Sequence, residues 1–238
     1  MNDKNAFDGL LLVDKPAGVT SHDVVAKIRR TFRIERVGHG GTLDPSATGL
    51  LILMLGRATK LSDRLMGGDK TYAGTLRFGL TTDSQDLDGE ILTETPVASL
   101  DRCHVEAEMQ KLTGDIYQIP PMVSALKRNG VPLYKLARKG EIVERQPRLV
   151  HVYKFALTAW DFPVQDPAFI VECTKGTYVR TLAHDLGQTL GCGAALSSLS
   201  RLASGRFRLV DAAPLATLAA LSPAELQQRV IPFAQAAM

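Results

Sequence analysis

Apolar residues form two short blocks near the N-terminus, at 9–14 and 50–55. Each block is bounded by charged or turn-forming residues, a pattern that is typical of a buried strand. Between the blocks, apolar residues recur three and four positions apart after Thr20 or Ser21, which predicts a helix capped by one of these hydroxyls. A later stretch, 71–78, alternates apolar and polar residues and predicts a half-buried strand.

The rest of the chain mixes helical and extended patterns. The expected elements are short helices at 58–65 and 133–138, longer helices at 100–112 and 177–190, and strands at 149–160 and 169–173. The acidic stretch 81–90 is expected to be an exposed loop, and the alanine-rich tail 212–238 a terminal helix. Because strands and helices do not alternate regularly, we expect an α+β fold rather than a doubly wound parallel sheet.

Composition is that of an ordinary globular protein. The 238 residues are 45% hydrophobic and 22% charged, which suits one large domain or two small ones. The longest apolar run, 50–55, is far shorter than the ~20 residues of a membrane-spanning helix, and the polar N-terminus does not resemble a signal peptide. Cys103, Cys173 and Cys192 are too widely spaced to suggest a disulfide framework or a zinc site. We therefore expect a cytoplasmic protein that makes no contact with membranes.

Positive charge is concentrated in one segment. The net charge is +3, but the segment 127–154 holds eight Lys or Arg residues and two Glu, a local charge of +6 that leaves −3 for the remainder. A basic block inside a nearly neutral chain resembles a nucleic-acid footprint. The alternative is a solvated surface face without a partner.

The stretch Gly38–Leu51, GHGGTLDPSATGLL, places one carboxylate on a loop ahead of a buried strand. Glycines permit tight turns, and Pro45 restricts the backbone on both of its sides, so Asp44 is expected to sit on a stiff loop. The alternative is an ordinary turn in which Asp44 bonds nearby N–H groups. A carboxylate with an arginine partner can serve as a nucleophile or base, and Arg180 is a candidate partner; its alternative is a surface salt bridge with a neighbour such as Asp185.

Other common chemistries lack their motifs in the sequence. GHGG is not followed by the Lys-Ser or Lys-Thr of a phosphate-binding P-loop, and HExxH and paired CxxC motifs are missing. No serine lies in a nucleophile elbow. We therefore expect neither a catalytic metal nor a cofactor.

Five stretches together resemble the pseudouridine synthases of the TruB type, which modify the T-arm of tRNA. HGGTLDPSATGLL resembles the signature that bears the family's catalytic aspartate. The other matches occur in the expected order: KPAGVTSHDVV at 15–25, PPMVSALKRNGVPLYKLARKG at 120–140, CTKGTYVRTLAHDLG at 173–187 and LSRLASGRF at 199–207. The resemblance therefore covers nearly the whole chain.

The resemblance implies a role for each matching residue. Asp44 corresponds to the catalytic aspartate, Arg180 to the arginine that pairs with it, and Tyr72 to the tyrosine that stacks on the target uracil. The residues implied in substrate binding are His39, which fills the gap left by the flipped nucleotide, Tyr178 and Leu199, which line the pocket, Lys15, which supports the N-terminal motif, and Lys127 and Arg128 in the RNA-gripping insertion. The alternatives are a loop histidine that satisfies backbone groups for His39, and core packing for Tyr72 and Leu199.

The resemblance also implies a fold and a reaction. The fold would be of the pseudouridine-synthase type, α+β with a mixed, largely antiparallel sheet flanked by helices. It would form a single catalytic domain over 1–238 with a basic insertion at about 119–148, and without a full C-terminal PUA domain. The enzyme would isomerise uridine at position 55 in the T-arm of tRNA, as a monomer that needs no cofactor. The alternatives are a non-catalytic RNA-binding or RNA-folding protein on the same scaffold, and a synthase that acts on ribosomal RNA.

Overall fold

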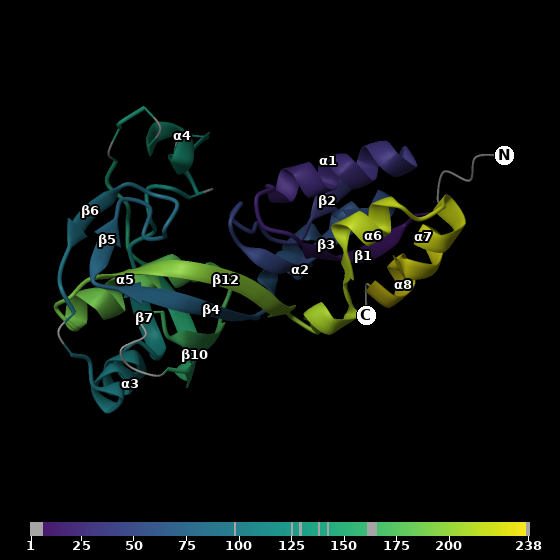
Figure 1. The fold of residues 1–238 in the computed structure, drawn as a ribbon. Helices are drawn as coiled ribbons and strands as arrows, with labels where there is room; N and C mark the ends of the chain where they lie inside the picture. The colour runs from purple at the N-terminus through teal and green to yellow at the C-terminus, as the bar shows by residue number, and fades with distance from the viewer. Residues whose placement is uncertain are drawn as a thin grey trace. The chain divides into compact units, whose positions relative to one another are not determined.

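The computed structural model describes residues 7–97, 99–124, 126–128, 130–137, 139–141, 143–160 and 166–236, with Lys127 and Arg128 described for the backbone alone. The chain divides into two compact units (Figure 1). Unit 1 comprises Met1–Thr71 and Ser200–Met238, and unit 2 comprises Tyr72–Leu199. Two strands, β4 (Lys70–Phe78) and β12 (Ala194–Ser204), begin in one unit and end in the other.

Unit 1 is built on two long neighbouring strands. Its elements are β1 (Gly9–Lys15), α1 (Ser21–Phe32), β2 (Val37–His39), β3 (Thr48–Leu55), the 3-10 helix η1 (Gly56–Leu61), α2 (Ser62–Gly67), β13 (Phe207–Arg208), the 3-10 helix η2 (Leu209–Asp211), β14 (Ala213–Pro214), α6 (Leu215–Ala219), α7 (Pro223–Arg229), β15 (Ile231–Pro232) and α8 (Phe233–Ala236). β1 and β3 pair antiparallel from Gly9↔Leu55 to Lys15↔Gly49. Both faces of these strands are buried, which explains why their sequences are uninterrupted apolar runs.

The helix expected after Thr20 is confirmed as α1. The Thr20 side chain accepts a hydrogen bond from the N–H of Asp23, and the Asp23 carboxylate accepts one from the N–H of Thr20, so the two residues form a capping box. The face of α1 that carries its apolar residues is buried. The predicted strand at 50–55 and the short helix at 58–65 are also confirmed.

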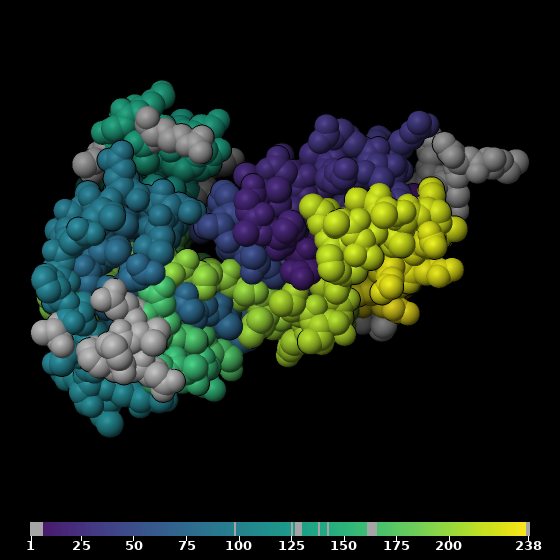
Figure 2. Space-filling view, in the orientation of Figure 1, coloured from purple at the N-terminus to yellow at the C-terminus, as the bar shows by residue number. Residues whose placement is uncertain are grey.

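The prediction of one terminal helix was wrong. The tail folds as the short helices α6, α7 and α8, and the two-residue strands β14 and β15 both pair with β1. Pro214, Pro223 and Pro232 stand at the breaks, because proline lacks the N–H that a continuing helix requires. In Figure 2 this tail, coloured yellow, lies against the purple N-terminal residues of the same unit.

Unit 2 is a sheet covered by two helices. Besides most of β4 and β12, its elements are β5 (Leu80–Thr82), β6 (Ile91–Glu94), α3 (Arg102–Lys111), β7 (Gly114–Gln118), β8 (Lys127–Arg128), β9 (Val131–Pro132), α4 (Leu133–Ala137), β10 (Arg148–Ala159), β11 (Ala168–Cys173) and α5 (Val179–Thr189). The strand order within the unit is β12-β4-β11-β10-β7, and β10 pairs antiparallel with both β11 and β7. One core joins the apolar faces of α3 and α5 to the inner face of this sheet.

The predicted α+β fold with a largely antiparallel sheet is confirmed. The helices expected at 100–112, 133–138 and 177–190 occur as α3, α4 and α5, with Arg138 outside the described residues. The strands expected at 71–78, 149–160 and 169–173 occur as β4, β10 and β11. Among the described residues, each helix is too short or too polar to cross a lipid bilayer.

Candidate active site

Asp44 lies on the loop between β2 and β3, and buried side chains hold the main chain on both sides of it. Ser21 at the start of α1 makes two hydrogen bonds with Leu43: its Oγ accepts from the N–H at 2.9 Å and donates to the carbonyl at 3.1 Å. After Asp44, the carbonyl of Pro45 accepts from Lys15 Nζ at 3.1 Å and from the N–H of Gly18 at 2.9 Å. Asp44 itself is half-buried. The stiffness that the sequence predicts for this loop therefore has a structural cause.

Lys15 is fully buried at the end of β1. Its ammonium donates to three main-chain carbonyls: Pro16 at 2.9 Å, Val19 at 2.7 Å and Pro45 at 3.1 Å. An ammonium has three N–H donors, so these carbonyls use its full capacity. Burial lowers the pKa of Lys15 from its usual 10.5, and the negative charge of nearby Asp44 is the strongest opposing influence. This lysine is thus coupled to the Asp44 loop by both hydrogen bonding and charge.

His39 ends β2, opposite Leu53 of β3, and its side chain is half-buried. Among the described residues, its Nδ1 has no hydrogen-bond partner. Burial lowers the pKa of His39 below 6.5, and the proximity of His22 and Arg201 lowers it further. The imidazole is therefore neutral at pH 7.

In unit 2, the start of α5 positions both Tyr178 and Arg180. Tyr178 is the N-cap residue of the helix, and the buried amide of Gln118 on β7 holds its main chain. Gln118 Oε1 accepts from the N–H of Tyr178 at 2.9 Å, and Gln118 Nε2 donates to its carbonyl at 3.2 Å. Tyr72 on β4 and Leu199 on β12 are half-buried at the border of the core of this unit.

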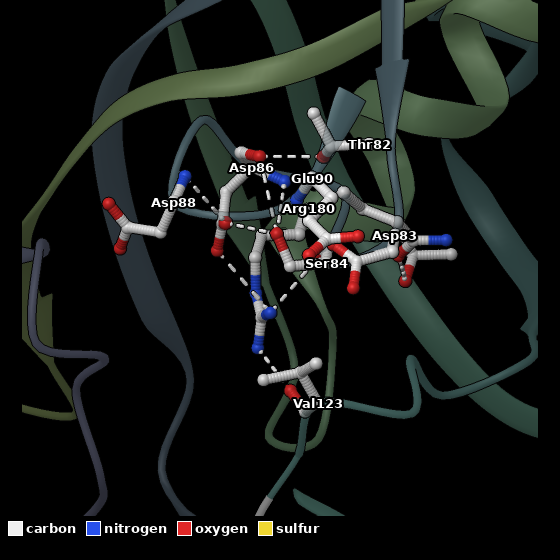
Figure 3. A network of polar contacts seen from close by, with 10 residues as sticks. Thr82, Asp83, Ser84, Asp86, Asp88, Glu90, Val123 and Arg180 are labelled. Carbon is white, nitrogen blue, oxygen red and sulfur yellow. Dashed lines mark hydrogen bonds and ion pairs between the residues drawn. The ribbon is translucent and has the colours of Figure 1, made fainter. Parts of the chain in front are cut away.

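Arg180 is buried, with 5% of its surface exposed, and it is held by three groups from two segments, the loop 84–86 and Val123 (Figure 3). Its Nη1 donates to the carbonyl of Ser84 at 3.0 Å and lies 3.4 Å from Asp86 Oδ2. Its Nη2 donates to the carbonyl of Val123 at 2.8 Å. The alternative of a surface salt bridge is wrong, because neither Arg180 nor Asp86 is on the surface.

The expectation of an exposed loop at 81–90 was also wrong in part. Thr82, Ser84 and Asp86 are buried, whereas Asp83 and Asp88 are exposed. The Asp86 carboxylate accepts hydrogen bonds from Ser84 Oγ and from the N–H of Asp88, the latter at 3.1 Å. Burial raises the pKa of Asp86 above 3.8, although its hydrogen bond from Ser84 and the charge of Arg180 oppose this. Sequence reasoning missed Asp86 because nothing local separates it from its exposed acidic neighbours.

The insertion contributes to the same network in unit 2. Val123, near its start, supplies one of the carbonyls that bind Arg180. Lys127 and Arg128 form β8, which pairs antiparallel with β9 and is followed closely by α4. Their side chains lie outside the described part of the chain.

The predicted site residues therefore fall into two groups, one in each unit. Unit 1 holds Asp44, Lys15 and His39, and unit 2 holds Tyr72, Tyr178, Arg180, Leu199, Lys127 and Arg128. Within the described ranges, no three His, Cys, Asp or Glu side chains gather in a way that could bind a metal ion.

Known proteins with similar sequences and folds are pseudouridine synthases. Residues 29–179 match the N-terminal domain of the TruB family of pseudouridylate synthases, and residues 180–235 match the C-terminal domain of tRNA pseudouridylate synthase B. The tRNA pseudouridine synthase B of Opitutus terrae is 53% identical over 98% of this chain and 96% of its own length. That of Dechloromonas aromatica is 49% identical over 94% of this chain and 74% of its own.

Solved structures agree with the sequence comparisons. A chain of a Cbf5-Nop10-Gar1 complex superposes with a TM-score of 0.76 at 27% identity, over 98% of this chain. The present chain spans 62% of the length of that chain.

Proposed function

This chain belongs to the TruB family of pseudouridylate synthases, and on that premise we propose that it isomerises uridine to pseudouridine in the T-arm of tRNA. The names of its relatives support tRNA as the substrate. The T-arm is proposed from the motifs that resemble those of the family, above all the insertion at 119–148. The two units would act as one catalytic domain.

The observation that carries the proposal is the way in which Asp44 is held. The main chain of its neighbour Leu43 is hydrogen-bonded to Ser21, and that of its neighbour Pro45 to Lys15. Ser21 and Lys15 are both buried. A carboxylate on such a loop has a fixed position and orientation, which a nucleophile or general base requires. An ordinary surface turn would not need two buried polar side chains to fix its main chain.

The reaction breaks the N1–C1′ bond of uridine, turns the base, and joins C5 to C1′. Atoms and electrons balance within one nucleotide, so the chain's own residues suffice in this scheme. Asp44 would attack the sugar or the base, or would remove a proton from the sugar. The target lies inside a base stack, and flipping it out costs a few kcal/mol. Stacking of the uracil on Tyr72 and insertion of the neutral His39 ring into the gap would offset part of that cost.

The proposal gives Arg180 the role of partner to Asp44. Arg180 already has a carboxylate, Asp86, and two carbonyls as ligands in unit 2. These ligands limit the rotation of the guanidinium, so the orientation of Arg180 is fixed. Asp86 is therefore proposed as a residue that positions Arg180 for catalysis.

The test is to incubate tRNA transcripts with the protein, tag pseudouridine chemically, and locate it by mass spectrometry. We expect one modified uridine in the T-arm with the wild-type chain. Asp44→Asn should bind tRNA as tightly as wild type, because phosphate contacts come from other residues, but should form no pseudouridine.

The matched control is Asp63→Asn, since Asp63 is exposed in the first turn of α2. This variant should retain full activity. Turnover by a folded Asp44→Asn protein would contradict the role of the carboxylate. Modification elsewhere in the tRNA would contradict the T-arm assignment. Modification of ribosomal RNA alone, in a parallel incubation with ribosomal RNA transcripts, would favour the other substrate class.

A further inference from the structure

Arg201 in β12 is a charged side chain in the core of unit 1, with only 2% of its surface exposed. A buried charge is costly unless hydrogen bonds compensate it. The guanidinium donates from Nε to the carbonyl of Leu50 at 2.8 Å, from Nη2 to that of Gly41 at 3.1 Å, and from Nη1 to that of Thr42 at 3.4 Å. All three carbonyls belong to the segment that carries Asp44.

The neighbouring strand makes room for this arrangement. β12 pairs parallel with β3 at Ser200↔Thr48 and Arg201↔Gly49. Gly49 has φ +95°, and a Cβ at this position would lie 2.5 Å from the carbonyl oxygen of Arg201 and 2.8 Å from its nitrogen. Only glycine fits here, so Gly49 allows the backbone of Arg201 to approach the loop closely.

Lys15 and Arg201 bind different carbonyls of the segment that carries Asp44. Lys15 binds the carbonyl of Pro45, directly after Asp44. Arg201 binds carbonyls at 41 and 42, before Asp44, and at 50, after the loop has entered β3. Main-chain carbonyls on both sides of Asp44 therefore accept hydrogen bonds from one of these two buried cations.

We propose that Arg201 is a positioning residue for catalysis, whose guanidinium fixes the position and orientation of the loop that carries Asp44. This inference rests on the proposed function. A planar fork with donors at Nε, Nη1 and Nη2 can hold three carbonyls at separate points, whereas an ammonium is a single compact centre. The charge and the shape of arginine are therefore both required at 201.

Arg201→Lys tests the shape requirement, because it keeps the charge. A misplacement of about 1 Å in a reacting group costs roughly 10²-fold in rate, so the single-turnover rate at saturating enzyme should fall by about that factor. The dissociation constant for tRNA should stay near the wild-type value. Arg208→Lys is the matched control: Arg208 is exposed and also donates to carbonyls, those of Gly205 and Phe207, which lie outside the Asp44 loop. It should react at the wild-type rate.

Hydrogen exchange gives a readout that does not depend on activity. In the wild-type chain, the N–H of Gly40 donates to Ile52 and that of Ala47 to the carbonyl of Asp44. Peptides that cover 40–47 should exchange faster in Arg201→Lys than in wild type, whereas peptides from α1 should not change. If wild type forms no pseudouridine, the proposed function fails, and the exchange data still decide whether Arg201 holds the loop.

Gly41→Ala tests the hydrogen bond between Arg201 and the Gly41 carbonyl by changing the loop instead of the arginine. Gly41 has φ +131°, a backbone conformation that residues with a side chain rarely adopt, so alanine should shift the backbone and displace the carbonyl that Arg201 binds, although its Cβ, 3.5 Å from Arg201 Nη1, would make only ordinary contact. The variant should lower the single-turnover rate with folding intact, and combining it with Arg201→Lys should add little, because both changes break the same hydrogen bond.

Additive effects of the two substitutions on the rate, or a wild-type rate in either folded variant, would overturn the proposal. A parallel loss of binding and melting temperature would also overturn it, since that result indicates a role in folding alone. If Arg201→Lys does not fold, Gly41→Ala decides.

Discussion

Asp86→Asn removes one charge from the ligands of Arg180 and leaves the shape of the site almost unchanged. The Asp86 and Arg180 side chains are 11% and 6% exposed, and Oδ2 lies 3.4 Å from Nη1. At that distance the gross attraction is about 5 kcal/mol for an effective dielectric constant near 20. Burial still raises the pKa of Asp86, so desolvation outweighs this attraction.

The expected loss of stability follows from the charge that is left behind. Removing one partner of a buried pair typically costs about 3–5 kcal/mol. Arg180 keeps the carbonyls of Ser84 and Val123, so we expect the lower end, about 3 kcal/mol. For a chain of this size that loss lowers the melting temperature by roughly 6–12 °C, which leaves the variant folded at 25 °C.

The variant should also change the pH dependence. The pKa of Asp86 is about 3.8 in the unfolded chain and higher in the folded chain. Between the unfolded-state and the folded-state pKa, the folded chain therefore binds more protons than the unfolded chain. The contribution of this group to the free energy of unfolding therefore falls as pH rises through that window. The ion pair with Arg180 is lost as pH falls through the folded pKa. We expect the acid limb of the wild-type single-turnover rate to contain this step, and Asp86→Asn to lack it.

The assay combines a thermal melt, a filter-binding titration and single turnover at enzyme excess. Asp88→Asn is the matched control, since Asp88 is exposed on the same loop (Figure 3). Asp86→Asn should bind tRNA normally and react roughly 10²-fold more slowly, because Arg180 is no longer oriented. A wild-type rate in the folded variant would refute this reasoning. A rate loss equal to the unfolded fraction would show that the pair serves stability alone.

Two further predictions concern RNA binding. Tyr72→Phe should retain tRNA affinity and Tyr72→Ala should lose it, because stacking of a base on an aromatic ring is worth ~1–3 kcal/mol; equal dissociation constants for the two variants in filter binding would exclude the stacking role. Joint neutralisation of Lys127, Arg128, Arg138 and Lys139 should weaken tRNA binding and flatten its salt dependence by roughly one unit of log–log slope per lost phosphate contact. An unchanged slope, measured from 50 to 200 mM salt, would instead favour a solvated basic face.

The sequence predicts best those elements whose own residues determine their form. β1 and β3 are recognisable because strands that are buried on both faces must be apolar throughout. α1 is recognisable because Thr20 and Asp23 complete a capping box at its first turn. In both cases local composition and burial point to the same structure, so the pattern suffices.

Elements that depend on distant partners are harder to predict. β12 has a sequence of small and polar residues, AALSSLSRLAS, which lacks the β-branched and aromatic residues that are typical of strands. It extends because β3 and β4 provide neighbours on either side. β14 and β15, with two residues each, likewise exist only because β1 offers them an edge.

The support of the candidate site was the least predictable part, and the reason lies in the partners that the cations use. Lys15, Arg180 and Arg201 all bind main-chain carbonyls, which every residue carries. The sequence of the bound loop therefore does not show that a buried cation binds its carbonyls. The signal is confined to the cation, and a lysine or arginine in a sequence looks the same whether it is exposed or buried. Family motifs could indicate Lys15 and Arg180 by resemblance, but Arg201 required the fold, because its function depends on a strand that approaches the loop at one glycine.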